Sequence, residues 1–131
     1  MKKILLKKGL VFSGCGFERT DMLIVDGKIA KIATRIHDDE AEEINLMGLY
    51  VLPGLVDVHV HLREPGFEYK ETIETGTKAA AHSGYTDIFS MPNLSPAPDT
   101  VENVKVQLKA IDKDAVIHVH PYGCITMGQK G

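Results

Sequence analysis

Hydrophobic and polar residues alternate with a period of two between residues 56 and 63, where three valines and a leucine interleave with charged and imidazole side chains. A period of two predicts a β-strand with two different faces, which we place at Leu55–Leu62. Turn residues precede it at Pro53-Gly54 and follow it at Glu64-Pro65-Gly66. Strict alternation places Asp57 on the same face as His59 and His61.

After this strand the pattern changes between helix and strand several times. A helix is predicted over Lys70–His82, where a run of alanines favours helix and Gly84 ends it. The next elements are a strand, a helix and a strand, at Thr86–Met91, Thr100–Ala110 and Val116–Tyr122. The apolar positions that share one face of the second helix are Val101, Val104, Leu108 and Ile111. Strand-helix-strand repeats of this length indicate parallel strands with right-handed crossovers.

Residues 1–52 have a different pattern, with short strands separated by tight turns. Asp26-Gly27 between Met22–Val25 and Lys28–Ala33 predicts a hairpin. The other short strands are expected at Ile4–Leu6, Leu10–Phe12 and Ile44–Leu46, the first two separated by a turn at Lys7-Lys8-Gly9. The acidic run 38–43 is interpreted as a solvated loop. We therefore expect two parts, residues 1–52 and residues 53–131.

Composition narrows the possible functions. The 131 residues carry a net charge of −3 and are 44% hydrophobic, which is ordinary for a soluble domain. There is no basic excess to bind nucleic acid, and no apolar run approaches the roughly 18 residues of a membrane span. Cys15 and Cys124 lie far apart in the sequence, so we expect two reduced thiols in a cytoplasmic protein.

Residues with metal-binding and anion-binding chemistry gather at the end of the first predicted strand. His59 and His61 share a face two residues apart, and paired imidazoles suit zinc and its first-row neighbours. Arg63, one step further on that face, has a planar fork that matches a carboxylate. Asn93 follows the next strand, so its loop should adjoin that of Arg63. Asp57, at the buried start of the strand, is expected to make a structural hydrogen bond.

Three stretches together resemble the dihydroorotases, a family of the metal-dependent amidohydrolase superfamily. The first is Pro-Gly-Leu-Val-Asp-Val-His-Val-His-Leu-Arg-Glu-Pro-Gly at residues 53–66. The others are Met91-Pro92-Asn93 with Pro96, Pro98, Asp99 and Thr100, and Tyr122-Gly123 with Ile125-Thr126 and residues 128–131. The resemblance implies an α/β fold, the N-terminal part of a (β/α)8 barrel preceded by a small β-sandwich segment. A complete barrel takes about 250 residues, so we expect only its first three strands and two helices in residues 53–131.

The resemblance also implies a chemistry: the reversible, zinc-dependent cyclisation of N-carbamoyl-L-aspartate to L-dihydroorotate in pyrimidine biosynthesis. His59 and His61 would bind one or two zinc ions, and Arg63 and Asn93 would bind the carboxylate of the substrate. The family's remaining ligands and its proton shuttle come from later strands, so no catalytic residue is assigned here. His118 and His120 form a second His-x-His pair. The family has no ligand on that strand, so they are interpreted as strand residues.

Several alternatives stay open. The chain could belong to another cyclic amidase, such as a hydantoinase, a dihydropyrimidinase or an allantoinase. It could also be a non-catalytic dihydroorotase-like partner protein, or a truncated remnant without activity. We expect a small-molecule substrate and either a homo-oligomer or association with the rest of the barrel, and we expect these 131 residues alone to be inactive.

Overall fold

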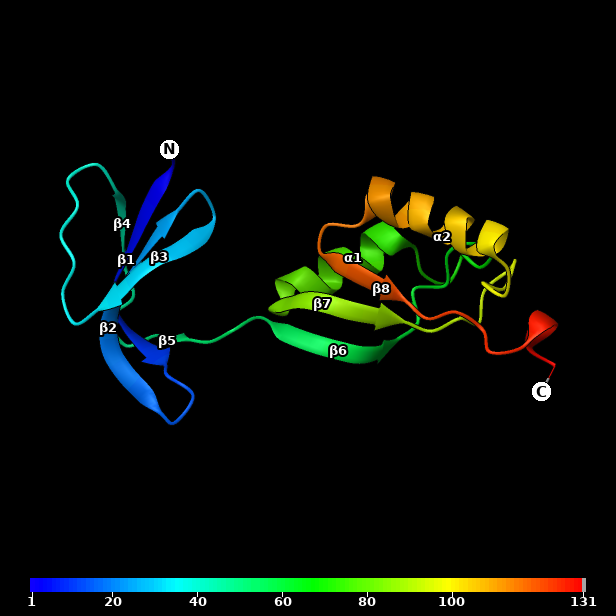
Figure 1. Ribbon diagram of the computed structural model, residues 1–131, viewed down its shortest axis with the longest axis horizontal. Helices are drawn as coiled ribbons and strands as arrows, with labels where there is room; N and C mark the ends of the chain where they lie inside the picture. The colour runs from blue at the N-terminus through cyan, green and yellow to red at the C-terminus, as the bar shows by residue number, and fades with distance from the viewer. Residues whose placement is uncertain (131) are drawn as a thin grey trace. The chain divides into compact units, whose positions relative to one another are not determined.

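The computed structural model describes residues 1–130 and divides into two compact units, with the boundary between Pro53 and Gly54 (Figure 1). The N-terminal unit is built from β-strands alone. The C-terminal unit alternates strands with helices. Each unit has its own sheet, so each is described separately.

The N-terminal unit is a single five-stranded sheet with β1 at its centre. Its strands are β1 (Lys3–Phe12), β2 (Phe17–Val25), β3 (Lys28–Ala33), β4 (Glu42–Asn45) and β5 (Tyr50–Val51). β1 pairs antiparallel with β2 and parallel with both β4 and β5, while β2 and β3 form the hairpin predicted at Asp26-Gly27. The described residues of this unit form one sheet, so the second layer of the predicted sandwich stays a prediction.

The turn predicted at Lys7-Lys8-Gly9 is wrong, because β1 runs through it as one strand. From Leu6 to Gly9 β1 advances three residues while β2 advances two, so the strand contains a bulge. Lys8 adopts a positive φ of 62° in this bulge, and its N–H donates to Asp21 Oδ1 at 2.9 Å. A buried side chain from the neighbouring strand thus satisfies the backbone group that the bulge displaces.

The acidic run was predicted as a solvated loop, and this is only partly right. Glu42 and Glu43 begin β4, because they pair with Ile4 and Leu5 of β1. Their side chains nevertheless remain exposed. Earlier in the run, Asp38 accepts a hydrogen bond from Lys3 Nζ at 3.0 Å, which is first among the contacts that hold its pKa below the ordinary value.

The C-terminal unit has the predicted order of elements. They are β6 (Leu55–Val60), α1 (Ile73–His82), β7 (Tyr85–Ser90), α2 (Val101–Asp114), β8 (His118–Pro121) and the short 3-10 turn η1 (Met127–Gln129). The strands are parallel in the order β6-β7-β8. Both helices pack on one face of this sheet (Figure 1), over a core centred on Leu62, Ile73 and Ile88. Among residues 1–130, no helix has the length and apolar character needed to cross a membrane.

Only part of the predicted apolar face of α2 packs on the core. Ile111 does so, whereas Val101 and Leu108 of the same face are 64% and 45% exposed. Gln107 is buried instead and donates from Nε2 to Ser90 Oγ of β7 at 3.2 Å. A hydrogen bond to the sheet, which hydrophobic periodicity cannot register, therefore helps to fix the face that α2 presents to β7.

Among the described residues of this unit, no helix covers the opposite face of the sheet (Figure 1). Ile117 and Val119 pack on the core, so alternation along β8 directs His118 and His120 to the opposite face. His120 stacks there on Phe89 of β7, with ring centroids 4.6 Å apart. We call this surface the open face; it carries imidazole, carboxylate and aromatic side chains.

Candidate functional site

The two histidines predicted to bind metal lie side by side at the end of β6. His59 is in the strand, and His61 follows its last residue, Val60. Their ring centroids are 5.3 Å apart, with the ring planes inclined at 68°. The structure thus brings the two imidazoles together as the sequence pattern predicted.

The placement of Asp57 on the histidine face is wrong. From Asp57 to Val60 β6 advances three residues while β7 advances two, from Ile88 to Ser90. Asp57 is therefore in register with buried Ile88 on the side that the helices cover. The expected structural hydrogen bond is present, since Asp57 Oδ1 accepts the His59 N–H at 2.9 Å. The carboxylate thus satisfies a backbone donor within the bulge.

A hydrogen bond joins the histidine pair to the loop after β7. His61 Nδ1 and Asn93 Oδ1 are 2.8 Å apart. Because a carboxamide oxygen only accepts, this contact requires the proton of the neutral imidazole to be on Nδ1. His61 Nε2 then carries the lone pair. The sequence predicted that Asn93 binds the substrate carboxylate. It did not predict this contact, which joins residues 32 positions apart.

Arg63 and Asn93 line one small cavity of about 240 Å³, as expected from neighbouring loops. The other lining residues are Phe67, Lys70, Leu94 and Gln129. Arg63 is no longer part of the strand, however. β6 ends at Val60, and Arg63 turns away with a positive φ of 66°. The predicted position on the strand face is therefore wrong, although the predicted proximity to Asn93 is present.

Close contacts hold the loops around this cavity together. Ser95 N donates to Pro65 O at 3.1 Å, and a Cβ on Gly66, whose φ is +99°, would overlap the Ser95 carbonyl oxygen. On the other side, Gly128 N donates to Asp99 Oδ2 at 2.6 Å. This bond is the main reason that the pKa of the Asp99 carboxyl lies below its ordinary value. The loops after all three strands therefore form one connected surface.

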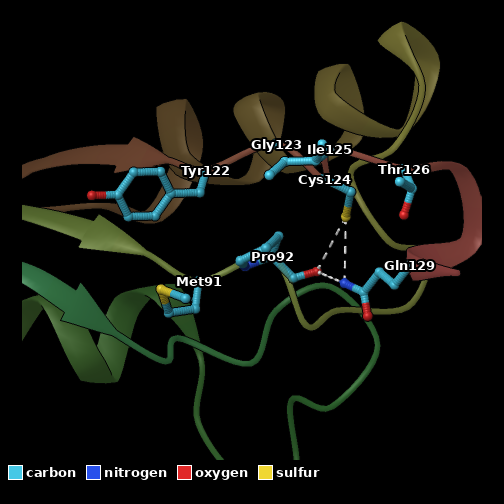
Figure 2. Close-up of a pocket in the computed structure, with 8 residues that line it drawn as sticks. All are labelled: Met91, Pro92, Tyr122, Gly123, Cys124, Ile125, Thr126 and Gln129. Carbon is cyan, nitrogen blue, oxygen red and sulfur yellow. Dashed lines mark hydrogen bonds between the residues drawn. The ribbon is translucent and has the colours of Figure 1, made fainter. Parts of the chain in front are cut away.

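A larger, mostly apolar pocket of about 700 Å³ lies between the loops after β7 and β8 (Figure 2). Gln129 Nε2 and Cys124 Sγ both contact Pro92 O, at 2.8 and 3.9 Å. The remaining lining residues are Met91, Tyr122, Gly123, Ile125 and Thr126. Most belong to the motifs that carry the resemblance, but the sequence analysis gave them no role. Gln129 lines this pocket and the Arg63 cavity, so it connects the two.

The second histidine pair lies apart from the first. His118 and His120 both contact Asp87 Oδ1 on the open face, at 3.3 and 2.8 Å. The hydrogen bond with His120 is first among the contacts that hold the pKa of Asp87 below its ordinary value. In residues 1–130 there is no grouping of three or more His, Cys, Asp or Glu side chains suited to a metal ion. His59 and His61 are a chemically suitable pair of zinc ligands, fewer than the three protein ligands of a catalytic zinc site.

Comparison with known proteins agrees with the motifs. The family model described as dihydro-orotase-like matches residues 48–131. Proteins named dihydroorotase from Bacillus cereus and Bacillus cytotoxicus are each 56% identical over 112 residues, covering 86% of this chain and 26% of theirs. The chain thus spans about a quarter of the length of these relatives.

Solved structures give a broader set of neighbours. An L-hydantoinase (dihydropyrimidinase) from Arthrobacter aurescens matches with a TM-score of 0.89 and 29% identity, covering 98% of this chain and 29% of that one. A dihydropyrimidinase from Brevibacillus agri matches with a TM-score of 0.82 and 29% identity, covering 94% and 27%. These neighbours share a mixed α/β architecture with this chain. Within that architecture, the chain belongs to the dihydro-orotase-like family.

Proposed function

We propose that the native protein is a dihydroorotase, which interconverts N-carbamoyl-L-aspartate and L-dihydroorotate in pyrimidine biosynthesis. The observation that carries this proposal is the pairing of Arg63 and Asn93 in one cavity, next to the His59–His61 pair. The 56% identity to proteins named dihydroorotase supports it. Residues 53–131 would be the first three strands and two helices of a (β/α)8 barrel. Residues 1–52 would be a flanking β-sandwich segment.

Each residue has a distinct role in this proposal. His59 and His61 would hold zinc through ring nitrogens, as part of a site for one or two ions. When bound, zinc supplies a Lewis acid and lowers the pKa of a water molecule. Arg63 would bind the substrate carboxylate through its two parallel N–H groups, and the Asn93 amide would add a third donor. Together Arg63 and Asn93 would orient the ring amide of the substrate toward the histidines. The enzyme would be cytoplasmic and would form a homo-oligomer.

A second candidate is a hydantoinase or dihydropyrimidinase, which the TM-score of 0.89 favours. Hydantoin and dihydrouracil are uncharged rings without a carboxylate. Either would leave the Arg63 guanidinium in the cavity without an anionic partner, which is costly when a site is built for one. The Arg63–Asn93 pairing therefore favours a substrate that carries a carboxylate.

The test uses the full-length native polypeptide. Hydrolysis of dihydroorotate, dihydrouracil and hydantoin is compared at equal enzyme concentration, and bound zinc is measured in parallel. We expect dihydroorotate to have by far the highest kcat/KM and the His59→Ala/His61→Ala variant to lose zinc. Faster turnover of dihydrouracil than of dihydroorotate would reject the proposal in favour of the second candidate. No turnover of any of the three would indicate a non-catalytic partner protein.

A further inference from the structure

Asn93 is positioned to take part in two interactions at once. Its Oδ1 lies 2.8 Å from His61 Nδ1, and its side chain lines the cavity that also contains Arg63. A carboxamide has one acceptor and one donor group. With the oxygen engaged by the imidazole, the NH₂ group is the part of Asn93 that remains to meet an anion.

We propose that Asn93 is a positioning residue for His61 as well as a substrate contact, so that it couples the metal site to the carboxylate site. Only the part of this inference that concerns the substrate carboxylate rests on the proposed function. The Asn93 oxygen holds His61 in the tautomer with the proton on Nδ1. Nε2 is thereby left unprotonated, as a metal ligand must be. Without this acceptor, His61 would have to find its tautomer and ring orientation unaided.

Coupling follows from the chemistry of a conjugated amide. Donation from His61 Nδ1 to Oδ1 draws electron density toward the oxygen, which makes the Asn93 N–H groups better donors. A carboxylate bound to these N–H groups pushes density back and strengthens the acceptor that orients His61. Each ligand should therefore raise the affinity for the other by the same factor.

Two substitutions separate the two interactions. Asn93→Asp keeps an oxygen acceptor for His61 but removes the amide donor and repels a carboxylate. Asn93→Ala removes both. Asn93 is exposed in its loop, so neither change disturbs the core. Asn45→Ala is the matched control, since Asn45 is an exposed asparagine in the N-terminal unit.

The first readout is the tautomer of His61, from long-range ¹H–¹⁵N NMR of the zinc-free native protein. It is recorded about two pH units above the ordinary imidazole pKa of about 6.5. We expect the Nδ1-protonated form in the parent, in Asn93→Asp and in Asn45→Ala, and a shift toward the Nε2-protonated form in Asn93→Ala. An Nε2-protonated His61 in the parent, or an unchanged tautomer in Asn93→Ala, would overturn the proposal.

The second readout is the zinc dissociation constant, from competition with a chelator, with and without N-carbamoyl-L-aspartate. Loss of an orienting partner typically weakens metal binding about 10- to 100-fold. We expect a weakening in this range for Asn93→Ala and none for Asn93→Asp or Asn45→Ala. N-carbamoyl-L-aspartate should tighten zinc binding in the parent but not in Asn93→Asp. Zinc affinities within twofold of each other in the parent and Asn93→Ala would contradict the proposal.

The design separates failure of this inference from failure of the proposed function. The tautomer and the zinc constant measured without substrate do not depend on which ring the enzyme opens. A protein that prefers dihydrouracil would reject the dihydroorotase assignment and leave both results unchanged. If the protein proves to be a dihydroorotase but the zinc dissociation constant of Asn93→Ala equals that of the parent, only the coupling is rejected.

Discussion

Replacing Asp21 with alanine should destabilise the N-terminal unit. Asp21 is 3% exposed, and its carboxylate accepts from Lys8 N at 2.9 Å, Ile36 N at 2.9 Å and Lys7 Nζ at 3.2 Å. The alanine variant leaves the buried Ile36 N–H without an acceptor, which costs about 1–3 kcal/mol. The Lys8 N–H and the Lys7 ammonium are closer to solvent, so their losses are smaller. We expect a total of about 2–4 kcal/mol.

Asparagine should not rescue this position. Its Oδ1 can serve one backbone N–H, but its NH₂ group would then face the other donor, so Asp21→Asn should still cost about 1–3 kcal/mol. The assay is hydrogen exchange of the β1–β2 amides, which reports the opening free energy of this sheet. Asp39→Asn is the control, because the Asp39 side chain is 87% exposed and should change nothing measurable. Equal protection in Asp21→Asn and the parent would refute the reasoning.

The same carboxylate predicts a dependence on pH. Burial alone would raise the pKa of Asp21, but the hydrogen bonds from Ile36, Lys8 and Lys7 outweigh it, and the pKa lies below the ordinary value of 3.8. A lowered folded-state pKa contributes stability that is fully present above 3.8 and is lost as the pH falls through the folded-state value. The difference between the parent and Asp21→Ala should therefore shrink as the pH falls below 3.8. A constant difference across this range would contradict the ionised carboxylate as its cause.

Three further predictions concern the site and its support, the first with a control substitution. Gly66→Ala should lower both thermal stability and affinity for N-carbamoyl-L-aspartate, whereas Gly84→Ala, with a similar φ of +89° but open space around it, should lower stability alone. Arg63→Lys should weaken substrate binding by about 1–3 kcal/mol per lost hydrogen bond, with zinc content unchanged by metal analysis. Ser90→Ala should cost about 1–3 kcal/mol in urea unfolding, because it leaves the buried Gln107 Nε2 without its acceptor.

Local sequence signals predicted the elements of this fold better than their details. Asp26-Gly27 gave the correct hairpin because a turn of that type is specified by the two residues themselves. The supposed turn at Lys7–Gly9 failed because its geometry depends on Asp21, a residue on another strand. The burial of Gln107 likewise depends on Ser90 of β7. These two errors therefore occurred where a distant polar partner decides the local conformation.

The candidate site divides in the same way. The closeness of His59 and His61 follows from a spacing of two residues on a strand, so the sequence was sufficient to predict it. The shared cavity of Arg63 and Asn93 follows from adjacent parallel strands, which the strand-helix-strand repeat indicated. The Asn93–His61 hydrogen bond could not be predicted in this way. It depends on the conformation of the loop after β7, and the residue pattern alone does not specify that conformation.

The bulge in β6 affects the face of the sheet on which the histidine side chain of this strand lies. Asp57 is in register with Ile88, on the side of the sheet that the helices cover. With strict alternation from Asp57, His59 and His61 would point to that same side, into the apolar core. The extra residue reverses the alternation, so that Val60 and Leu62 pack on the core and His59 occupies a strand position that alternates with Val60. The Asp57 carboxylate holds the His59 N–H at 2.9 Å within this irregularity. The aspartate therefore contributes to the site through the backbone, because it supports the one-residue insertion that moves His59 off the face of the sheet on which Asp57 lies.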